Sequence, residues 1–312
     1  MDEATALGAG PLQQFVHGDG IEGTKTLPAD SVHAIISDIP YGIGAEDWDV
    51  LHNNTNSAYR GASPAQLKAG NSTFKARGKP INGWSAADRA IPREYQQWCS
   101  AWAEHWLRVL KPGGSAFVFA GRRFSHRMIT ALEDVGFSLK DQIAWIKPNA
   151  PHRAQRVSVV FERRGNTAAA QQWDSWRLGN LRPTFEPVVW FTKPYKVGTT
   201  IADNVLNHGV GAYYPDALNT VSREVSNVLT SGITRMESGL HPTQKPFDLM
   251  AALVSLVTSP GQIVLDPFAG SGTTLAAAKY LGRGYIGFEL DEGYAGIAQK
   301  RLDNLTEVNP LW

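Results

Sequence analysis

Four short apolar runs share one pattern along the chain, and each ends in an acidic residue. They read "FVHGD" ending at Asp19, "AIISD" at Asp38, "QIVLD" at Asp266 and "YIGFE" at Glu289. Near-continuous apolar runs of this length are typical of strands covered on both faces, as in a parallel sheet. Ligands of such sheets bind beyond the carboxyl ends of the strands. The pattern therefore predicts that the four acids converge on one crevice.

Amphipathic helices are predicted between these runs. From residue 94 to 110, apolar side chains recur at three- and four-residue spacing, with Cys99 among them. The sequence "KPGG" at 111–114 ends this helix and leads into a strand at 115–121. Further helices are predicted at 247–257, 273–281 and 292–305. The alternation predicts a doubly wound, Rossmann-like α/β sheet.

Two stretches break the alternation. Residues 51–90 are rich in Asn, Ser, Gly, Ala and Lys without sustained periodicity, and a loop of that length is usually functional or disordered. Residues 149–239 are irregular apart from one returning sheet strand at 186–193. The net charge of the chain is only +1, but residues 51–90 and 149–183 carry about +5 and about +4. These segments are either solvated surfaces or the contact surfaces for an acidic partner.

The composition narrows the class of protein. No apolar run reaches the roughly 20 residues of a membrane span, and the first ten residues carry acids where a signal peptide carries Lys or Arg. A cytoplasmic protein with no membrane contact is expected. The single cysteine excludes an intramolecular disulfide and a cysteine-rich zinc site. None of the eight histidines forms a metal-ligand pair, so no metal is expected.

A second motif, "VLDPFAGSGTTLAAAKYLG", runs from 264 to 282. Its glycines permit close approach of a ligand to the backbone, and the helix that follows offers free N–H groups at its start. Glu289 closes the next strand 17 residues after Gly272, where an acid can accept both hydroxyls of a ribose. Leu275 stands where nicotinamide dehydrogenases have a third glycine, which makes that class a distant alternative. No Gly-Lys-Ser/Thr follows, which argues against an ATP-hydrolysing P-loop.

Taken together, these motifs resemble one family. "DPFAGSGTT", preceded by "HPTQKP" at 241–246 and followed by "GYIGFELDEGYAGIAQKRL", resembles the S-adenosylmethionine-binding half of amino-directed DNA methyltransferases. "SDIPYG" resembles their catalytic Asp-Pro-Pro-Tyr motif. The catalytic motif precedes the cofactor motif, as in the β group of DNA adenine and N4-cytosine methyltransferases.

The resemblance implies the organisation and the partners of the chain. Residues 1–148 would be the catalytic half with the basic loop 51–90, residues 149–239 the target-recognition region, and residues 240–312 the cofactor-binding half. S-adenosyl-L-methionine would be the cofactor and double-stranded DNA the substrate. The family further implies a homodimer, a cognate restriction endonuclease as a possible partner, and a bacterial or phage origin.

The resemblance also assigns roles to residues. Phe268 would pack on the cofactor adenine, Glu289 would hold the ribose, Asp19 the adenine amine, and Lys245 would lie near the cofactor carboxylate. Asp266 would either order the glycine loop or touch the ligand. The backbone of the glycine loop would approach the methionine portion of the cofactor. The remaining cofactor-binding residues would be Ala269, Gly270, Ser271, Gly272 and, at the start of the helix, Thr273.

The basic segments would contact DNA phosphates. The candidate residues are Arg60, Lys75, Arg77, Arg153, Arg156, Arg163, Arg164, Arg177 and Arg182.

The motif "SDIPYG" can be explained by the chemistry of an exocyclic amine. Such an amine is a poor nucleophile because its lone pair is delocalised into the ring, and the catalyst must accept hydrogen bonds from it. Asp38 supplies a carboxylate acceptor and the carbonyl of Ile39 a second one. Pro40 fixes the backbone, and the face of Tyr41 can stack on a base extruded from the duplex. The family usually has Pro at position 39, so this loop is expected to be less rigid.

Several alternatives stay open on the sequence. Cytosine-directed relatives usually have Ser in place of the Asp, so Asp38 favours adenine, although Ser37 keeps N4-cytosine transfer open. Carbon-5 cytosine chemistry needs a nucleophilic cysteine, and Cys99 lies on the apolar face of a helix. A catalytically idle DNA-binding subunit is a further alternative, and the intact motifs argue against it.

Overall fold

The computed structural model describes residues 11–41, 86–150, 154–233 and 244–305. A mixed sheet of eight strands forms the centre of the molecule, in the order β1-β10-β9-β2-β3-β7-β4-β8. A second, two-stranded sheet pairs β5 with β6. The strands are β1 (Gln13–His17), β2 (Val32–Asp38), β3 (Leu110–Phe119), β4 (Ser138–Ile146), β5 (Gln155–Arg156), β6 (Arg177–Leu178), β7 (Phe185–Thr192), β8 (Val228–Thr230), β9 (Ile263–Asp266) and β10 (Gly284–Glu289).

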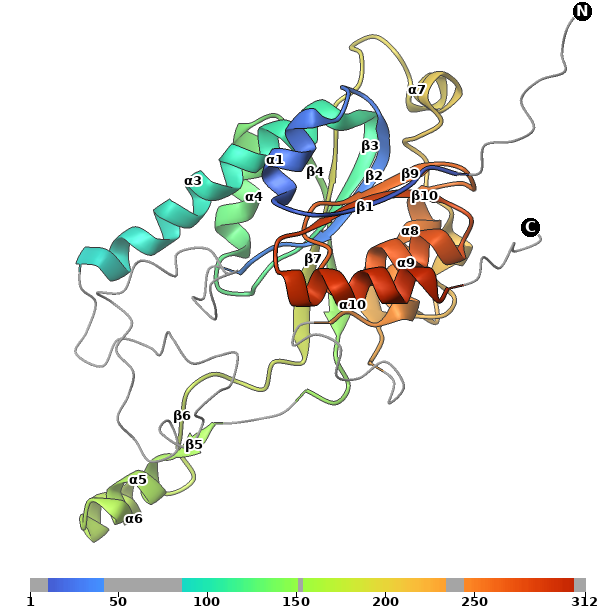
Figure 1. The fold of residues 1–312 in the computed structure, drawn as a ribbon. Coiled ribbons are helices and arrows are strands. Elements are labelled where there is room, and N and C mark those ends of the chain that lie inside the picture. The colour runs from blue at the N-terminus through green and yellow to red at the C-terminus, as the bar shows by residue number, and fades with distance from the viewer. Residues whose placement is uncertain (1–10, 42–85, 151–153, 234–243, 306–312) are drawn as a thin grey trace, which may run out of the picture.

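Helices cover both faces of the central sheet. Figure 1 shows α1, α3 and α4 on one side and α8, α9 and α10 on the other. The helices are α1 (Gly20–Thr26), α3 (Ala86–Val109), α4 (Ser125–Asp134), α5 (Val157–Arg163), α6 (Thr167–Gln172), α7 (Ile201–His208), α8 (Phe247–Val257), α9 (Thr273–Tyr280) and α10 (Glu292–Asp303), with a 3-10 turn η2 (Pro215–Leu218). This is the doubly wound α/β architecture that the alternation of runs predicted.

The four acid-ended runs are neighbours in the sheet. β1 pairs with β10, β10 with β9 and β9 with β2, all in parallel. Their carboxyl ends therefore meet at one edge of the sheet, as predicted. β3 continues the parallel set, and β7 is antiparallel to both β3 and β4.

Alternation along the strands explains the continuous apolar runs. In β2, Ala34 and Ile36 face the core beneath α8 and α9, whereas Ile35 faces the core beneath α3 and α4. In β3, Phe117 faces the first of these cores and Val118 the second. Successive side chains of a strand point to opposite faces, so a strand buried on both faces must be apolar at every position.

The structure corrects three boundaries. α3 begins at Ala86, within the segment predicted to be a loop, and Pro92 lies inside this helix. α3 ends at Val109, directly before "KPGG", but β3 begins at Leu110 and contains residues 111–114, earlier than the predicted start at 115. Gly113 takes φ +77 there, and a register shift between Val32 and Ala34 accommodates the irregularity. Residues 111–114 have no partners on β2, and Gly113 and Gly114 instead exchange backbone hydrogen bonds with Lys193. α10 ends at Asp303, two residues earlier than predicted.

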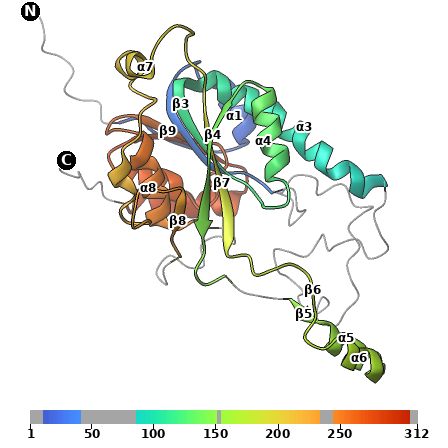
Figure 2. The ribbon, with the colours of Figure 1, turned by 180° about the vertical axis from the view of Figure 1, so that it is seen from behind.

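The inserted region is divided between two places. The β5–β6 hairpin with α5 and α6 stands away from the main sheet in both views (Figures 1 and 2). The returning strand is confirmed as β7, and β8 adds a second return by pairing in parallel with β4. No pattern in the sequence indicated β8, which is only three residues long. Among the described residues, no helix is long and apolar enough to cross a membrane.

Candidate active site

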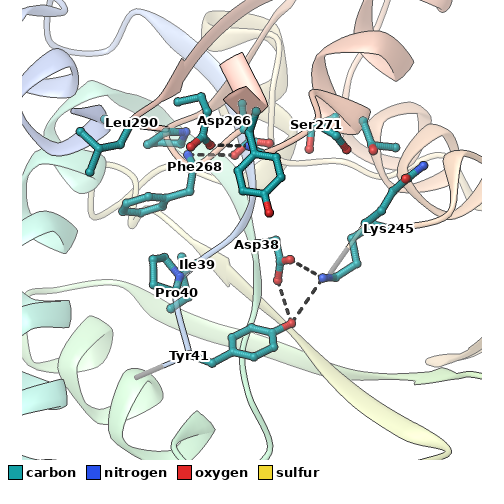
Figure 3. A pocket seen from close by; sticks show the side chains of 18 of the residues that line it. Asp38, Ile39, Pro40, Tyr41, Lys245, Asp266, Phe268, Ser271 and Leu290 are labelled. Atoms are coloured by element: carbon teal, nitrogen blue, oxygen red, sulfur yellow. Dashed lines mark hydrogen bonds and ion pairs between the residues drawn. The ribbon is translucent and has the colours of Figure 1, made fainter. Parts of the chain in front are cut away.

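A cavity of about 270 Å³ lies at the carboxyl ends of the parallel strands. All four strand-end acids line it: Asp19 after β1, Asp38 at the end of β2, Asp266 at the end of β9 and Glu289 at the end of β10. Figure 3 shows Asp38 and Tyr41 on one side of this cavity, with Asp266 and Phe268 opposite. The crevice predicted from the four runs is therefore present.

Two of these acids hold the glycine loop in shape. Glu289 accepts hydrogen bonds from the backbone N–H of Gly270 at 2.7 Å and of Asp291 at 2.8 Å. Asp266 accepts from the Ser37 hydroxyl at 2.6 Å and from the N–H of Phe268 at 3.2 Å. Burial raises the pKa of Asp266 to about 6 and also raises the pKa of Glu289. Both carboxylates therefore order backbone as well as line the cavity.

The glycine loop needs residues without a side chain. Gly272 takes φ +74, the left-handed conformation, and begins α9. Gly270 takes φ +53 and presents its N–H to Glu289. Left-handed backbone is disfavoured for residues with a Cβ. The spacing of the glycines is thus explained by the turn between β9 and α9.

Asp19 caps the helix that follows β1. Its carboxylate accepts a hydrogen bond from the N–H of Ile21 at 2.7 Å, and α1 begins at Gly20. A Cβ on Gly20 would lie 1.8 Å from the carbonyl oxygen of Pro267, so the turns after β1 and β9 touch directly. The cap fixes Asp19 at the rim of the cavity, where the sequence placed it.

An aromatic wall stands beside the glycine loop. The ring of Phe268 is partly exposed and lies 5.9 Å from Trp98, 6.3 Å from Trp102 and 6.2 Å from Trp106, measured between ring centres. Trp98 itself lines the cavity. The sequence predicted Phe268 but not Trp98, because Trp98 follows the same apolar spacing as the buried residues of α3.

Asp38 is held by two neighbours. Its Oδ1 accepts a hydrogen bond from the Tyr41 hydroxyl at 2.8 Å, and its Oδ2 forms an ion pair with Lys245 (Figure 3). Burial raises the pKa of the Asp38 carboxyl, and the positive charge of Lys245 only partly offsets this. Both oxygens keep lone pairs, because a carboxylate offers about four acceptor sites.

The loop that carries Asp38 is fixed by packing. Ile39 is 1% exposed and belongs to the core beneath α3. The carbonyl of Pro40 accepts a hydrogen bond from the Tyr95 hydroxyl at 2.9 Å. A Cβ on Gly121 would lie 3.0 Å from the Tyr41 ring, so this glycine leaves room for the tyrosine. The less rigid loop expected from Ile39 is braced by these contacts.

Lys245 lines the cavity and contacts the residues of the "SDIPYG" motif. Its ammonium contacts the carboxylate of Asp38 and the hydroxyl of Tyr41, the latter at 3.3 Å. The side chain is 5% exposed. Lys245 therefore belongs to the catalytic side of the cavity, and contact with a cofactor carboxylate stays a prediction.

Glu186 and Lys147 are site residues that the sequence did not reveal. Glu186, on β7, accepts a short hydrogen bond from Tyr41 and pairs with Lys147 at 2.5 Å. Burial pushes the pKa of Glu186 upward, but Lys245 and Lys147 outweigh burial and leave this pKa below its usual value. An acid at the start of the otherwise apolar "FEPVVWFT" was the available indication.

Gln244 brings an amide to the lining of the cavity. Both polar atoms of its amide are buried without a hydrogen-bond partner among the described residues, and the residue lines the cavity. An unsatisfied buried amide costs about 1–3 kcal/mol, so a ligand that supplies a donor and an acceptor is expected here. S-adenosylmethionine fits this set: the aromatic wall suits its adenine, the acids its hydroxyls, and Gln244 its polar methionine end.

The described candidates for DNA contact lie on the inserted region. Arg156, Arg163, Arg164 and Arg177 are exposed around the β5–β6 hairpin. Arg182 is also exposed, but its guanidinium donates to the carbonyls of Ala150 at 2.6 Å and Pro148 at 3.0 Å, which braces the connection to β4. The other four candidates, Arg60, Lys75, Arg77 and Arg153, lie outside the described residues, as does most of the loop 51–90.

No metal site competes with this interpretation within the described part of the chain. The structure contains no group there of three or more His, Cys, Asp or Glu side chains that could hold a metal ion. The cavity acids are instead satisfied by backbone N–H groups, hydroxyls and Lys245.

The parallel sheet with one reversed strand, the glycine loop and the acid at the end of the neighbouring strand are the features expected of a methyltransferase. Comparison with known proteins identifies its kind: residues 32–300 match the DNA methylase family, and the chain belongs to it. The resemblance seen in the sequence is confirmed. Because this family uses S-adenosylmethionine, the chain is an S-adenosylmethionine-dependent DNA methyltransferase.

The chain is similar to characterised relatives over nearly its whole length. It is 54% identical over 291 residues to the Type II methyltransferase M.HindIII of Haemophilus influenzae, covering 92% of this chain and 94% of that protein. It is 27% identical to the Type II methyltransferase M.HinfI of Haemophilus influenzae, covering 96% of this chain and 70% of that one.

Two solved structures share the fold. The PvuII DNA methyltransferase (cytosine-N4-specific) matches with a TM-score of 0.59 at 17% identity, covering 96% of this chain and 92% of that one. A putative DNA modification methylase of Thermus thermophilus, TTHA0409, in complex with S-adenosylmethionine, matches with a TM-score of 0.56 at 16% identity, covering 95% and 96%.

Proposed function

We propose that this DNA methyltransferase transfers its methyl group to the N6 amine of adenine in double-stranded DNA, at a specific site. The observation that carries the proposal is Asp38, whose carboxylate lines the same cavity as Phe268 and the glycine loop. An acceptor for the amine and the elements expected to bind the cofactor thus share one cavity.

The chain's own residues would activate the amine. Asp38 accepts hydrogen bonds from it, which localises the lone pair, and the carbonyl of Ile39 is the second acceptor. Pro40 aims this carbonyl, and the face of Tyr41 stacks on the base. The base must leave the duplex, since its amine is otherwise paired. When bound, S-adenosylmethionine supplies the methyl group from its sulfonium.

The cofactor is proposed to lie along the four strand ends. Phe268 and Trp98 would flank its adenine, Asp19 would accept the adenine amine and Glu289 the ribose hydroxyls. The backbone from Ala269 to Gly272 would pass the methionine portion, with Thr273 beginning the helix behind it. The contacts of Asp266 with Ser37 and Phe268 support a role in ordering the loop.

Adenine is favoured over N4-cytosine by two observations. Position 38 is Asp, where cytosine-directed relatives usually have Ser. The nearby Ser37, which kept cytosine open, is 0% exposed and donates its hydroxyl to Asp266 at 2.6 Å. The Ser37 hydroxyl therefore binds Asp266, which precedes the glycine loop, and is buried away from an incoming base.

Mass spectrometry of nucleosides tests the choice of base. DNA from a methylation-free host, treated with the protein and S-adenosylmethionine, should yield N6-methyladenine. Methylcytosine as the sole product would transfer the assignment to N4-cytosine, and no methylated nucleoside at all would favour an idle DNA-binding subunit. Sequencing the same DNA with a modification-sensitive readout would give the recognition sequence.

We propose that residues 51–90 and 149–239 bind the DNA, with Arg and Lys on phosphates. Each phosphate contact adds about −0.9 to the slope of log affinity against log salt concentration. Reversing Arg163 and Arg164 to Glu should remove up to about two phosphate contacts and flatten that slope accordingly. Fluorescence anisotropy with a labelled duplex measures the affinity at each salt concentration. Reversal of Lys300 on α10, far along the chain, is the control. A wild-type slope near zero would contradict the proposal for both segments.

A homodimer and a cognate restriction endonuclease are further proposals. The resemblance to the β group supports the dimer, and the Type II designation of M.HindIII supports the endonuclease. Light scattering of the free protein at micromolar concentration measures the first. A monomer in that measurement would contradict it.

A further inference from the structure

One hydroxyl stands between two carboxylates at the catalytic side of the cavity. The Tyr41 oxygen lies 2.8 Å from Asp38 Oδ1 and makes a still shorter contact with Glu186 Oε1. Figure 3 shows the Asp38, Tyr41 and Lys245 part of this cluster. A phenol carries a single proton, so it donates to only one of the two acids at a time. A proton that arrives on Asp38 would satisfy the second contact.

The two acids differ in their surroundings. Asp38 faces the cavity, where burial raises its pKa, and its charged neighbours are Lys245, Glu186 and Asp266. Glu186 faces Tyr41, Lys147 and Lys245, and the two lysines lower its pKa. Because its pKa is the lower one, Glu186 can hold a proton only briefly and releases it readily to water, whereas Asp38 is the acid that holds a proton longer.

Glu186 lies behind Tyr41 and does not line the cavity. Glu186 is 8% exposed, whereas the side chain of its partner Lys147 is 31% exposed. A continuous series of contacts thus leads from Asp38 through the Tyr41 hydroxyl and Glu186 to an ammonium that reaches solvent. Glu186 and Lys147 lie on the side of Tyr41 away from the proposed base-binding cavity, so these two residues do not contact the base.

We propose that Tyr41 and Glu186 form a proton exit for the methylated amine, with Glu186 as a positioning residue that acts through Tyr41. The inference rests on the proposed function, because it needs an amine that becomes cationic beside Asp38. It adds to Tyr41 a role for its hydroxyl, whereas the sequence indicated a role only for its ring.

Protons and charge balance at every step of this exit. As the bond between the amine nitrogen and the methyl carbon forms, the methyl–sulfur bond breaks and the nitrogen gains positive charge. One amine proton moves to Asp38 in the same transition state. Asp38 then passes a proton to the Tyr41 oxygen while the Tyr41 proton moves to Glu186, which restores Asp38 as a carboxylate and leaves the phenol neutral. Glu186 finally loses the proton to water beside Lys147.

Two variants test this exit, Glu186→Gln and Tyr41→Phe. Both keep the size of the side chain and remove a proton-transfer group. In steady-state methylation we expect each to lower the rate by up to about a hundredfold near neutral pH, the lower end of what positioned proton transfer contributes, because Asp38 must lose its proton before the next turnover. The deficit should shrink as the pH rises, because hydroxide can replace the missing acceptor. The double variant should lose little more than either single one, since both interrupt the same path.

The control is Glu133→Gln, an exposed acid on α4, which should leave the rate unchanged. Calorimetric titration with S-adenosylmethionine and the melting temperature report whether the variants are folded. A wild-type rate in Glu186→Gln would overturn the inference. So would a deficit that is equal at every pH and additive with Tyr41→Phe, since packing alone would cause it. In either case wild-type formation of N6-methyladenine would leave the proposed function intact.

Discussion

Asp38→Asn should bind S-adenosylmethionine normally and lose about a hundred- to a thousandfold in turnover. As the amine attacks, it becomes cationic, and a carboxylate in a partly dehydrated pocket stabilises that developing charge. Asn can still accept one hydrogen bond but brings no charge. Removal of a single electrostatic stabiliser typically costs this much, about 2.7–4 kcal/mol of transition-state stabilisation.

The structure adds a second consequence of this substitution. The side chain of Lys245 is 5% exposed and would lose its ion pair with Asp38, although it keeps the contact with the Tyr41 hydroxyl and lies over the rings of Phe119 and Trp145. Breaking a buried pair by removing one partner is strongly destabilising. We therefore expect a lower melting temperature for Asp38→Asn, and partial recovery of that temperature, without recovery of turnover, when Lys245→Met is added.

Single-turnover kinetics and calorimetry check the prediction together. Asp134→Asn, an exposed acid at the end of α4, should match the wild type in both measurements. Near-wild-type turnover in Asp38→Asn would refute the electrostatic role of the carboxylate. Loss of cofactor affinity by the same factor as turnover would mean that Asp38 shapes the whole cavity instead.

The sequence predicted the half of the site that lies on contiguous segments. Each acid at a strand end is visible because an apolar run precedes it, and parallel pairing brings these ends together without further information. The glycine loop is likewise local, because the left-handed turn at Gly272 and the start of α9 follow each other in the chain. The strand ends and the glycine loop depend on the burial of successive strand residues and on the backbone preferences of turn residues, both of which can be read from neighbouring positions in the sequence.

The other half of the site depends on pairing between distant strands. Glu186 reaches Tyr41 only because β7 enters between β3 and β4, and Lys147 reaches Glu186 because β4 is its neighbour. Trp98 follows the same apolar spacing as the core residues of α3, so the sequence does not distinguish a residue that lines the cavity from one that packs in the core. The ion pair of Lys245 with Asp38 was not predicted for the same reason, since the two residues lie 207 positions apart in the chain.

Glu289→Ala should lower the affinity for S-adenosylmethionine about ten- to a hundredfold. The carboxylate is placed to accept the ribose hydroxyls, and hydrogen bonds to charged groups are worth about 1.5–3 kcal/mol. The same carboxylate accepts the N–H of Gly270 and of Asp291, so the substitution would also free the glycine loop. Loss of the ribose contact and loss of the loop contacts would both weaken binding, and a second variant distinguishes the two effects.

Glu289→Gln retains an acceptor for one of the two N–H groups but brings no charge. If the loop contacts dominate, the affinity of Glu289→Gln should lie close to that of the wild type. If the carboxylate binds the ribose, it should approach that of Glu289→Ala. Calorimetric titration measures both, with Glu292→Ala, an exposed acid in the first turn of α10, as the matched control. Because Glu289→Ala also leaves the N–H groups of Gly270 and Asp291 without this acceptor, we expect its melting temperature without cofactor to fall below that of Glu289→Gln. Unchanged affinity in Glu289→Ala would remove the residue from the cofactor site, although the cavity and its other three acids would remain.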